Sequence, residues 1–146
     1  MEKTRVAGIV PMEDGFVFMH RVGVEKNKDY QEYYTFPGGR LEEGETPEEG
    51  TIREIKEEFG IQVKIVKKLY EIYSEKFQQK EIFYLCEYLE GEFGTGNGPE
   101  FSNDPNYADS GKYIPEIIKK EEVKNILLLP KNIKEKLIED MKKSFT

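Results

Sequence analysis

Residues 39–61 read GRLEEGETPEEGTIREIKEEFGI, and this stretch decides how the rest of the chain is interpreted. Thr46 is a favourable N-cap, and Glu49 three residues later completes a capping box that satisfies two free backbone N–H groups. Gly60 supplies the left-handed residue at which many helices end. The stretch therefore predicts a helix over Pro47–Phe59, with the proline at the first helical position, where it is well tolerated.

The predicted helix separates apolar side chains from acidic ones. At about 100° per residue, one face gathers the apolar residues Ile52, Ile55 and Phe59, which must pack on the core. A second arc of about 100° gathers the carboxylates of Glu54, Glu57 and Glu58. Like charges at these spacings cost about 0.2–0.5 kcal/mol per pair. A solvated charged face is the ordinary explanation, but a hard divalent cation such as Mg²⁺ or Mn²⁺ would also account for the clustering.

Composition narrows the classes of protein to which the chain can belong. The 146 residues include 22 Lys and Arg against 29 Asp and Glu, a formal net charge of −7. Residues 39–61 hold eight Glu against three basic residues, so the acidity is concentrated there. Long nucleic acids are bound through clustered Lys and Arg, so we expect none as a partner. A single Cys and a single His exclude a disulfide framework and a zinc site built from several such residues.

Length and hydropathy favour a single domain over residues 1–146, with 18 aromatic residues to build its core. No run approaches the roughly 20 apolar residues of a membrane span. The N-terminus leads into a strand pattern rather than the apolar core of a signal peptide, so we expect a cytoplasmic protein without membrane contacts. The sequence does not specify the oligomeric state, and a homodimer stays open.

Apolar periodicity predicts an α/β domain in which helices flank a mixed sheet. Arg5–Val10 and Phe16–Arg21 are expected to be strands that pair through the Asp-Gly turn between them. Further strands are expected at Tyr33–Phe36, Ile61–Tyr73 and Lys80–Glu90.

Beyond these strands, residues 91–111 are rich in Gly and Pro and predict a long loop. Residues 112–146 carry a small excess of Lys and are interpreted as a solvated segment. Within that segment an amphipathic helix is expected from the helical spacing of Ile133, Leu137, Ile138 and Met141.

The acidic stretch resembles the Nudix box at every defined position: Gly39, five residues, Glu45, seven residues, and then Arg53–Ile61. The preceding segment Tyr33–Gly39, an aromatic strand followed by Pro-Gly-Gly, is similar to the corresponding segment of family members. The resemblance covers roughly residues 5–90 and is weak beyond them.

This resemblance implies the Nudix fold, an α/β/α sandwich with a mixed β-sheet, and hydrolysis of a diphosphate linked to another moiety. It implies that Mg²⁺ or Mn²⁺ is held by the carboxylates of Glu54, Glu57 and Glu58, one of which also accepts a proton from the attacking water. A pyrophosphate and an acidic helix repel each other, so a cation between them is needed for binding.

The remaining positions of the box also receive roles from the resemblance. Glu45 and Arg53 are implied as the pair that ties the loop to the helix. Gly38 and Gly39 are implied as a tight turn at the substrate, with a backbone carbonyl that can reach the metal.

Residues outside the box are weaker candidates, each with an ordinary structural alternative. Glu100 is a candidate for an additional metal ligand or for a solvated loop residue. Tyr34 is a candidate for stacking on a base or for core packing. Arg21 and His20 could contact a phosphate or base, or simply lie at the surface.

The leading hypothesis is Mg²⁺-dependent hydrolysis of a small nucleotide, most simply a normal or modified nucleoside triphosphate cleaved to the monophosphate and pyrophosphate. The alternatives are a non-catalytic nucleotide-sensing module, and a hydrolase of dinucleotides, nucleotide sugars or RNA 5′ ends. Isomerisation of an allylic diphosphate is a further alternative, but it requires a reactive Cys, and Cys86 falls in a predicted core strand.

Overall fold

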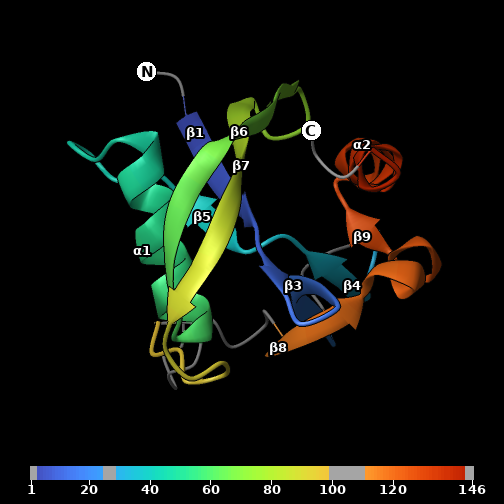
Figure 1. Ribbon diagram of the computed structural model, residues 1–146. Helices are drawn as coiled ribbons and strands as arrows, with labels where there is room; N and C mark the ends of the chain where they lie inside the picture. Colours follow the sequence, from blue (N-terminus) through green and yellow to red (C-terminus); the bar gives the residue numbers. More distant parts are fainter. Residues whose placement is uncertain (1–2, 25–28, 99–110, 144–146) are drawn as a thin grey trace.

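The computed structural model of the chain describes residues 3–24, 29–98 and 111–143, and it contains two β-sheets with helices on either side (Figure 1). The first sheet has the strand order β5 (Gly38–Arg40), β1 (Lys3–Ile9), β7 (Gln79–Glu90) and β6 (Gln62–Ser74). Strands β1 and β7 run parallel and the other neighbours run antiparallel, so this sheet is mixed.

The second sheet is built around β3 (Gly15–Val22). Strand β8 (Lys112–Lys119) pairs with the whole length of β3. On the other edge of β3, β2 (Pro11–Met12) pairs with its first residues and β4 (Glu32–Thr35) pairs with its last residues. The short strand β9 (Leu128–Leu129) joins β4 in parallel.

Two helices cover the sheets from opposite sides, as Figure 1 shows: α1 (Pro47–Phe59) and α2 (Lys131–Met141). The 3₁₀ helix η3 (Lys120–Asn125) precedes β9. One core cluster lies under α1, and a second joins both sheets to α2. The layers confirm the expected α/β/α arrangement. Among the described residues, no helix combines the length and apolar character that crossing a bilayer requires.

The prediction that the first two strands pair with each other is wrong. β1 lies in the first sheet and β3 in the second, and the Asp14–Gly15 turn closes a hairpin between β2 and β3 instead. All residues from Val6 to Val10 are buried. A strand buried on both faces suits the interior of a sheet beside a parallel neighbour, and that long-range pairing outweighs the local hairpin signal.

The interpretation of residues 112–146 as an ordinary solvated segment is also wrong for its first eight residues. Strand β8 forms there and matches β3 from Gly15 to Val22. Its sequence, KYIPEIIK, mixes charged and apolar residues and contains Pro115. Such a strand is tolerated at a sheet edge, where β8 lies among the described residues.

Candidate active site

Helix α1 is held firmly at both ends and on one face. Thr46 Oγ1 accepts the backbone N–H of Glu49 at 3.1 Å, and the Glu49 carboxylate accepts the N–H of Thr46 at 2.9 Å, so the predicted capping box is present. Gly60 ends the helix with a φ of 75°. Ile55 and Phe59 are fully buried. Because this apolar face is fixed, the direction of the acidic face is fixed as well.

Arg53 is the centre of the charged network on α1. Its Nε lies 2.6 Å from Glu45 Oε2 and its Nη2 lies 3.1 Å from Glu45 Oε1, a bidentate pair that ties the preceding loop to the helix. Its Nη1 donates to Glu54 Oε1 at 3.0 Å and to Glu57 Oε2 at 3.2 Å. The hydrogen bond with Glu45 is the main reason why the pKa of Arg53 is raised and that of Glu45 is lowered.

Of the two helix carboxylates that Arg53 contacts, Glu54 is more enclosed than Glu57, and Gly39 leaves space for it. Its side chain is 16% exposed, against 34% for Glu57. Burial raises the pKa of Glu54, and the neighbouring Arg53 opposes that rise. A Cβ atom on Gly39 would lie only 2.4 Å from the carboxyl carbon of Glu54. A side chain at position 39 would therefore push this carboxylate aside.

Gly38 and Gly39 form a strand rather than the expected tight turn. They belong to β5, where they pair with Ala7 and Val6 of β1. The backbone N–H of Gly38 donates to Glu58 Oε1 at 2.9 Å, which binds the C-terminal part of α1 to the strand. A Cβ on Gly38 would lie 2.1 Å from the carbonyl oxygen of Val6. These glycines are thus needed for close contacts and not for a turn conformation.

The donor set at this edge fits a hard divalent cation. Among the described residues, no group of three or more Asp, Glu, His or Cys side chains is already gathered closely enough to hold a metal ion. However, oxygens of Glu54 and Glu57 both lie within 3.2 Å of one Arg53 nitrogen, and Glu58 is anchored next to Gly39. Carboxylate and carbonyl oxygens are the ligands that Mg²⁺ and Mn²⁺ prefer.

The acidic face of α1 opens onto a cleft of about 970 Å³ between the two sheets. One wall is the face of the first sheet that is turned toward the second sheet, including Arg5 and Glu81, and the other wall carries Arg21, Tyr33 and Tyr113. The cleft thus combines carboxylates, guanidinium groups and aromatic rings. These are the groups that bind metal, phosphate and base in a nucleotide site.

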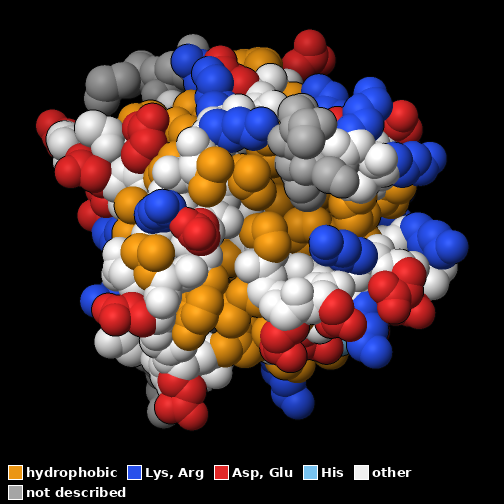
Figure 2. All heavy atoms as spheres, in the orientation of Figure 1, with side chains coloured by type: hydrophobic (Ala, Val, Ile, Leu, Met, Phe, Trp, Pro, Cys, Tyr) orange, Lys and Arg blue, Asp and Glu red, His pale blue; other side chains and the backbone are white. Residues whose placement is uncertain are grey.

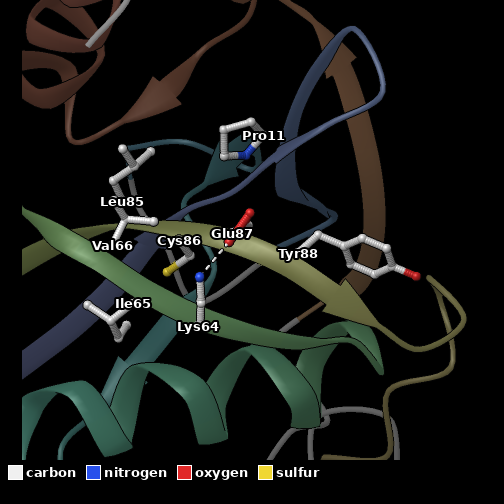
Figure 3. A pocket seen from close by; sticks show the side chains of 8 residues that line it. All are labelled: Pro11, Lys64, Ile65, Val66, Leu85, Cys86, Glu87 and Tyr88. Atoms are coloured by element: carbon white, nitrogen blue, oxygen red, sulfur yellow. Dashed lines mark ion pairs between the residues drawn. The ribbon is translucent and has the colours of Figure 1, made fainter. Parts of the chain in front are cut away.

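A second hollow lies on the outer side of the β6–β7 hairpin, and it lacks comparable chemistry. Figure 2 shows hydrophobic side chains gathered over the middle of this face, and Figure 3 shows the residues that line the hollow. Its charged pair, Lys64 and Glu87, is joined by an ion pair of 3.1 Å. Since these charges satisfy each other, the cleft beside α1 is the candidate active site.

The structure brings Arg21 into the cleft and leaves Tyr34 outside it. The Arg21 guanidinium lies 3.7 Å from the ring centroid of Tyr113. Successive residues of a strand face opposite sides, so Tyr33 lines the cleft while Tyr34 stacks on His20 at 4.2 Å. Tyr34 therefore packs against His20 and does not line the cleft.

His20 also lies outside the cleft. Both ring nitrogens of His20 contact carboxylates within the second sheet, those of Glu32 and Glu116. Glu100 lies outside the described residues.

Several cleft residues were not predicted from the sequence. Arg5, Glu81, Tyr33 and Tyr113 all line the cleft, and each belongs to a different strand. Only the strand alternation of Gln79, Glu81 and Phe83 gave a local signal, since it places two polar residues on the same face as a core aromatic residue.

Comparisons with known proteins agree with this geometry. A family model for the NUDIX domain matches residues 2–104. The 8-oxo-dGTP diphosphatase of Haemophilus influenzae is 34% identical over 114 residues, which are 75% of this chain and 81% of the relative. The ADP-ribose pyrophosphatase of Methanocaldococcus jannaschii is 33% identical over 97 residues, which are 63% of this chain and 54% of the relative.

Solved structures have the same fold at low sequence identity. The MutT protein from Methanosarcina mazei superposes with a TM-score of 0.67 at 17% identity, covering 99% of this chain and 96% of that protein. The family match, the curated relatives and the acidic helix at the cleft lead to one conclusion. The chain belongs to the Nudix family and is a pyrophosphohydrolase.

Proposed function

We propose that the protein hydrolyses a phosphoanhydride bond of a small nucleotide, with a divalent cation, Mg²⁺ or Mn²⁺, held at the acidic face of α1. The observation that carries this proposal is the placement of Glu54 and Glu58 against the glycine strand β5, with Glu57 held beside Glu54 by Arg53, in the lining of the cleft. The carbonyl of Gly39 and the carboxylate of Glu100 are proposed as additional ligands.

When bound, such a cation neutralises charge on the phosphoryl oxygens and lowers the pKa of a coordinated water. The protein's own side chains accept the proton, position the carboxylates and contact the substrate. One of the three helix carboxylates accepts the proton of the attacking water. Arg53, paired with Glu45, holds Glu54 and Glu57 in position, and the backbone of Gly38 holds Glu58. Arg21, on the opposite wall, is placed to contact the substrate.

The proposed substrate is a normal or modified nucleoside triphosphate, cleaved to the monophosphate and pyrophosphate. The relative from Haemophilus influenzae is named an 8-oxo-dGTP diphosphatase, and it shares most of its length with this chain. The net charge of −7 disfavours a long RNA, which would be repelled outside the metal site. The proposed location of the protein is the cytoplasm.

The alternative of allylic diphosphate isomerisation is disfavoured by the environment of the cysteine. Cys86 is buried in the core under α1, and burial raises the pKa of its thiol to about 12. It cannot supply a reactive thiolate at neutral pH. Because one relative is named an ADP-ribose pyrophosphatase, nucleoside diphosphate derivatives are the second candidate substrate class.

A substrate screen with product analysis tests the proposal. Normal and oxidised nucleoside triphosphates, ADP-ribose, a dinucleotide, a nucleotide sugar and capped RNA are each incubated with Mg²⁺, and phosphate, pyrophosphate and monophosphate are measured. We expect the highest kcat/KM for a triphosphate, with pyrophosphate released. A higher value for ADP-ribose would change the substrate, and no turnover of any compound would leave only a sensing role.

A further inference from the structure

A buried carboxylate that the proposed chemistry does not use lies on the floor of the cleft. Glu81 of β7 is only 6% exposed, yet it lines the cleft. Gln79 donates its side-chain amide to Glu81 Oε2 at 2.8 Å. Among the described residues Glu81 forms no other side-chain hydrogen bond and no salt bridge, not even with its strand neighbour Arg5. Its second oxygen, Oε1, is not sealed off from the cleft, so a water molecule or a ligand there can complete its hydrogen bonds.

The register of the first sheet places Glu81 two strands away from β5, the strand against which the acidic helix α1 lies. Arg40 of β5, Arg5 of β1 and Glu81 of β7 are paired in sequence across three neighbouring strands, which lie side by side in Figure 1. Neighbouring strands are about 4.8 Å apart, so Glu81 lies about 10 Å from β5. All three residues line the cleft. A ligand that extends from β5 toward β7 would therefore pass the guanidinium groups of Arg40 and Arg5 before it reaches the carboxylate of Glu81.

This order matches the order of groups in a nucleotide. Phosphates beside the cation would be followed by Arg40 and Arg5, whose guanidinium groups line the cleft and attract anions. The next moiety along a nucleotide is its sugar. Glu81 Oε1 and the carbonyl oxygen of Gln79 are both hydrogen-bond acceptors, and a pair of neighbouring acceptors is suited to the two hydroxyl groups of a ribose.

We propose that Glu81 and Gln79 form a ribose-binding subsite that makes this enzyme select ribonucleotides over 2′-deoxyribonucleotides. This inference rests on the proposed nucleotide hydrolysis and adds the class of sugar to it. A site built to bond a hydroxyl group discriminates strongly against the analogue that lacks it, because its acceptors are then left unpaired.

The experiment compares GTP with dGTP, and ATP with dATP, in the wild-type enzyme and in Glu81→Gln. We expect the wild type to prefer each ribonucleotide by about tenfold or more in kcat/KM, the effect of one hydrogen bond to a charged acceptor. In Glu81→Gln the preference should fall to within about threefold of unity through a loss on the ribonucleotides alone. Glu87→Gln, the same change on β7 in the outer hollow, is the matched control and should keep the wild-type preference.

Three kinetic results would overturn the subsite. These are equal turnover of GTP and dGTP by the wild type, an equal loss on both in Glu81→Gln, and a loss on GTP that spares ATP, which would mean that Glu81 contacts the guanine edge. A binding measurement separates this proposal from the hydrolase proposal. If calorimetry with Mg²⁺ shows GMP bound at least about tenfold more tightly than dGMP by an inactive protein, the subsite stands and the hydrolase proposal fails. Equal affinity, or no measurable binding of GMP, refutes the subsite.

Discussion

Replacing Gly39 by alanine should disable the site without unfolding the protein. The new Cβ would lie 2.4 Å from the carboxyl carbon of Glu54 and 2.5 and 2.6 Å from its oxygens. Ordinary van der Waals contact starts near 3.4 Å, so the carboxylate must retreat by about 1 Å. That retreat breaks the 3.0 Å hydrogen bond from Arg53 and turns a proposed metal ligand away from the cleft.

The expected effect is large on catalysis and small on stability. A displacement of about 1 Å in a catalytic group can lower kcat about 100-fold. The free energy of unfolding should change by less than about 1 kcal/mol. Loss of a partly exposed ion pair costs at most about that much, while alanine in place of glycine restricts the unfolded chain and restores about 0.4–1 kcal/mol.

Steady-state kinetics and thermal denaturation, run together, test this prediction. Gly44→Ala is the control from the same segment, because Gly44 has a φ of 82° and open space around its Cβ position. That variant should lose about 1 kcal/mol of stability to backbone strain and keep its kcat. Wild-type kcat in Gly39→Ala would contradict this prediction, and so would a loss of activity in both variants that only follows their loss of stability.

Three further perturbations separate catalytic from structural roles. Glu57→Gln should lower kcat by at least about 100-fold, because a metal supplies several kcal/mol of transition-state stabilisation, and the thermal midpoint should stay near that of the wild type; a marked loss of stability with modest loss of kcat would make Glu57 structural. Glu45 has a folded-state pKa below its ordinary value of 4.5, so the stability that it contributes through Arg53 is present above pH 4.5 and is lost as the pH falls through the folded-state pKa. The difference in thermal midpoint between the wild type and Glu45→Gln should therefore be constant near neutral pH and shrink below pH 4.5; a difference that grows in acid would contradict this sign. Tyr70→Phe removes the hydrogen bond that Tyr70 donates to Asp140 on α2, and it should cost about 1–2 kcal/mol of unfolding free energy with kcat unchanged; urea denaturation and a kinetic assay check both parts, and a fall in kcat at full stability would be inconsistent with a role confined to α2.

The helix that carries the acidic residues was predictable because its determinants are local. The cap at Thr46, the proline beside it and the stop at Gly60 fix its ends, and the spacing of Ile55 and Phe59 fixes its buried face. The ion pair between Glu45 and Arg53 was also expected and is present.

The sheets were less predictable because their pairing is set at long range. Nothing near Val10 shows that the chain moves from one sheet to the other at that point. The Pro-Gly-Gly composition before Arg40 indicates a turn, whereas the need for glycine comes from Glu54 and Val6, which are distant in sequence. The neighbours Tyr33 and Tyr34 could not be told apart until the register of β4 was known.

The cleft itself depends on both sheets. Arg5 and Glu81 are 76 positions apart and meet only because β1 and β7 run parallel. A single sequence contains no local signal for such a pairing, so the floor of the cleft could be found only from the structure.

The central claim, that the carboxylates of α1 hold the cation on which hydrolysis depends, is tested most directly by titrating Mn²⁺ and following the free ion by electron paramagnetic resonance. The wild type and the double variant Glu57→Gln/Glu58→Gln are compared, with turnover of the best triphosphate measured on the same samples with and without EDTA. We expect saturable binding and EDTA-sensitive turnover in the wild type, and loss of both in the double variant. Unchanged Mn²⁺ binding in the double variant would show that these carboxylates do not hold the cation. Wild-type turnover that persists in excess EDTA would show that hydrolysis does not depend on it.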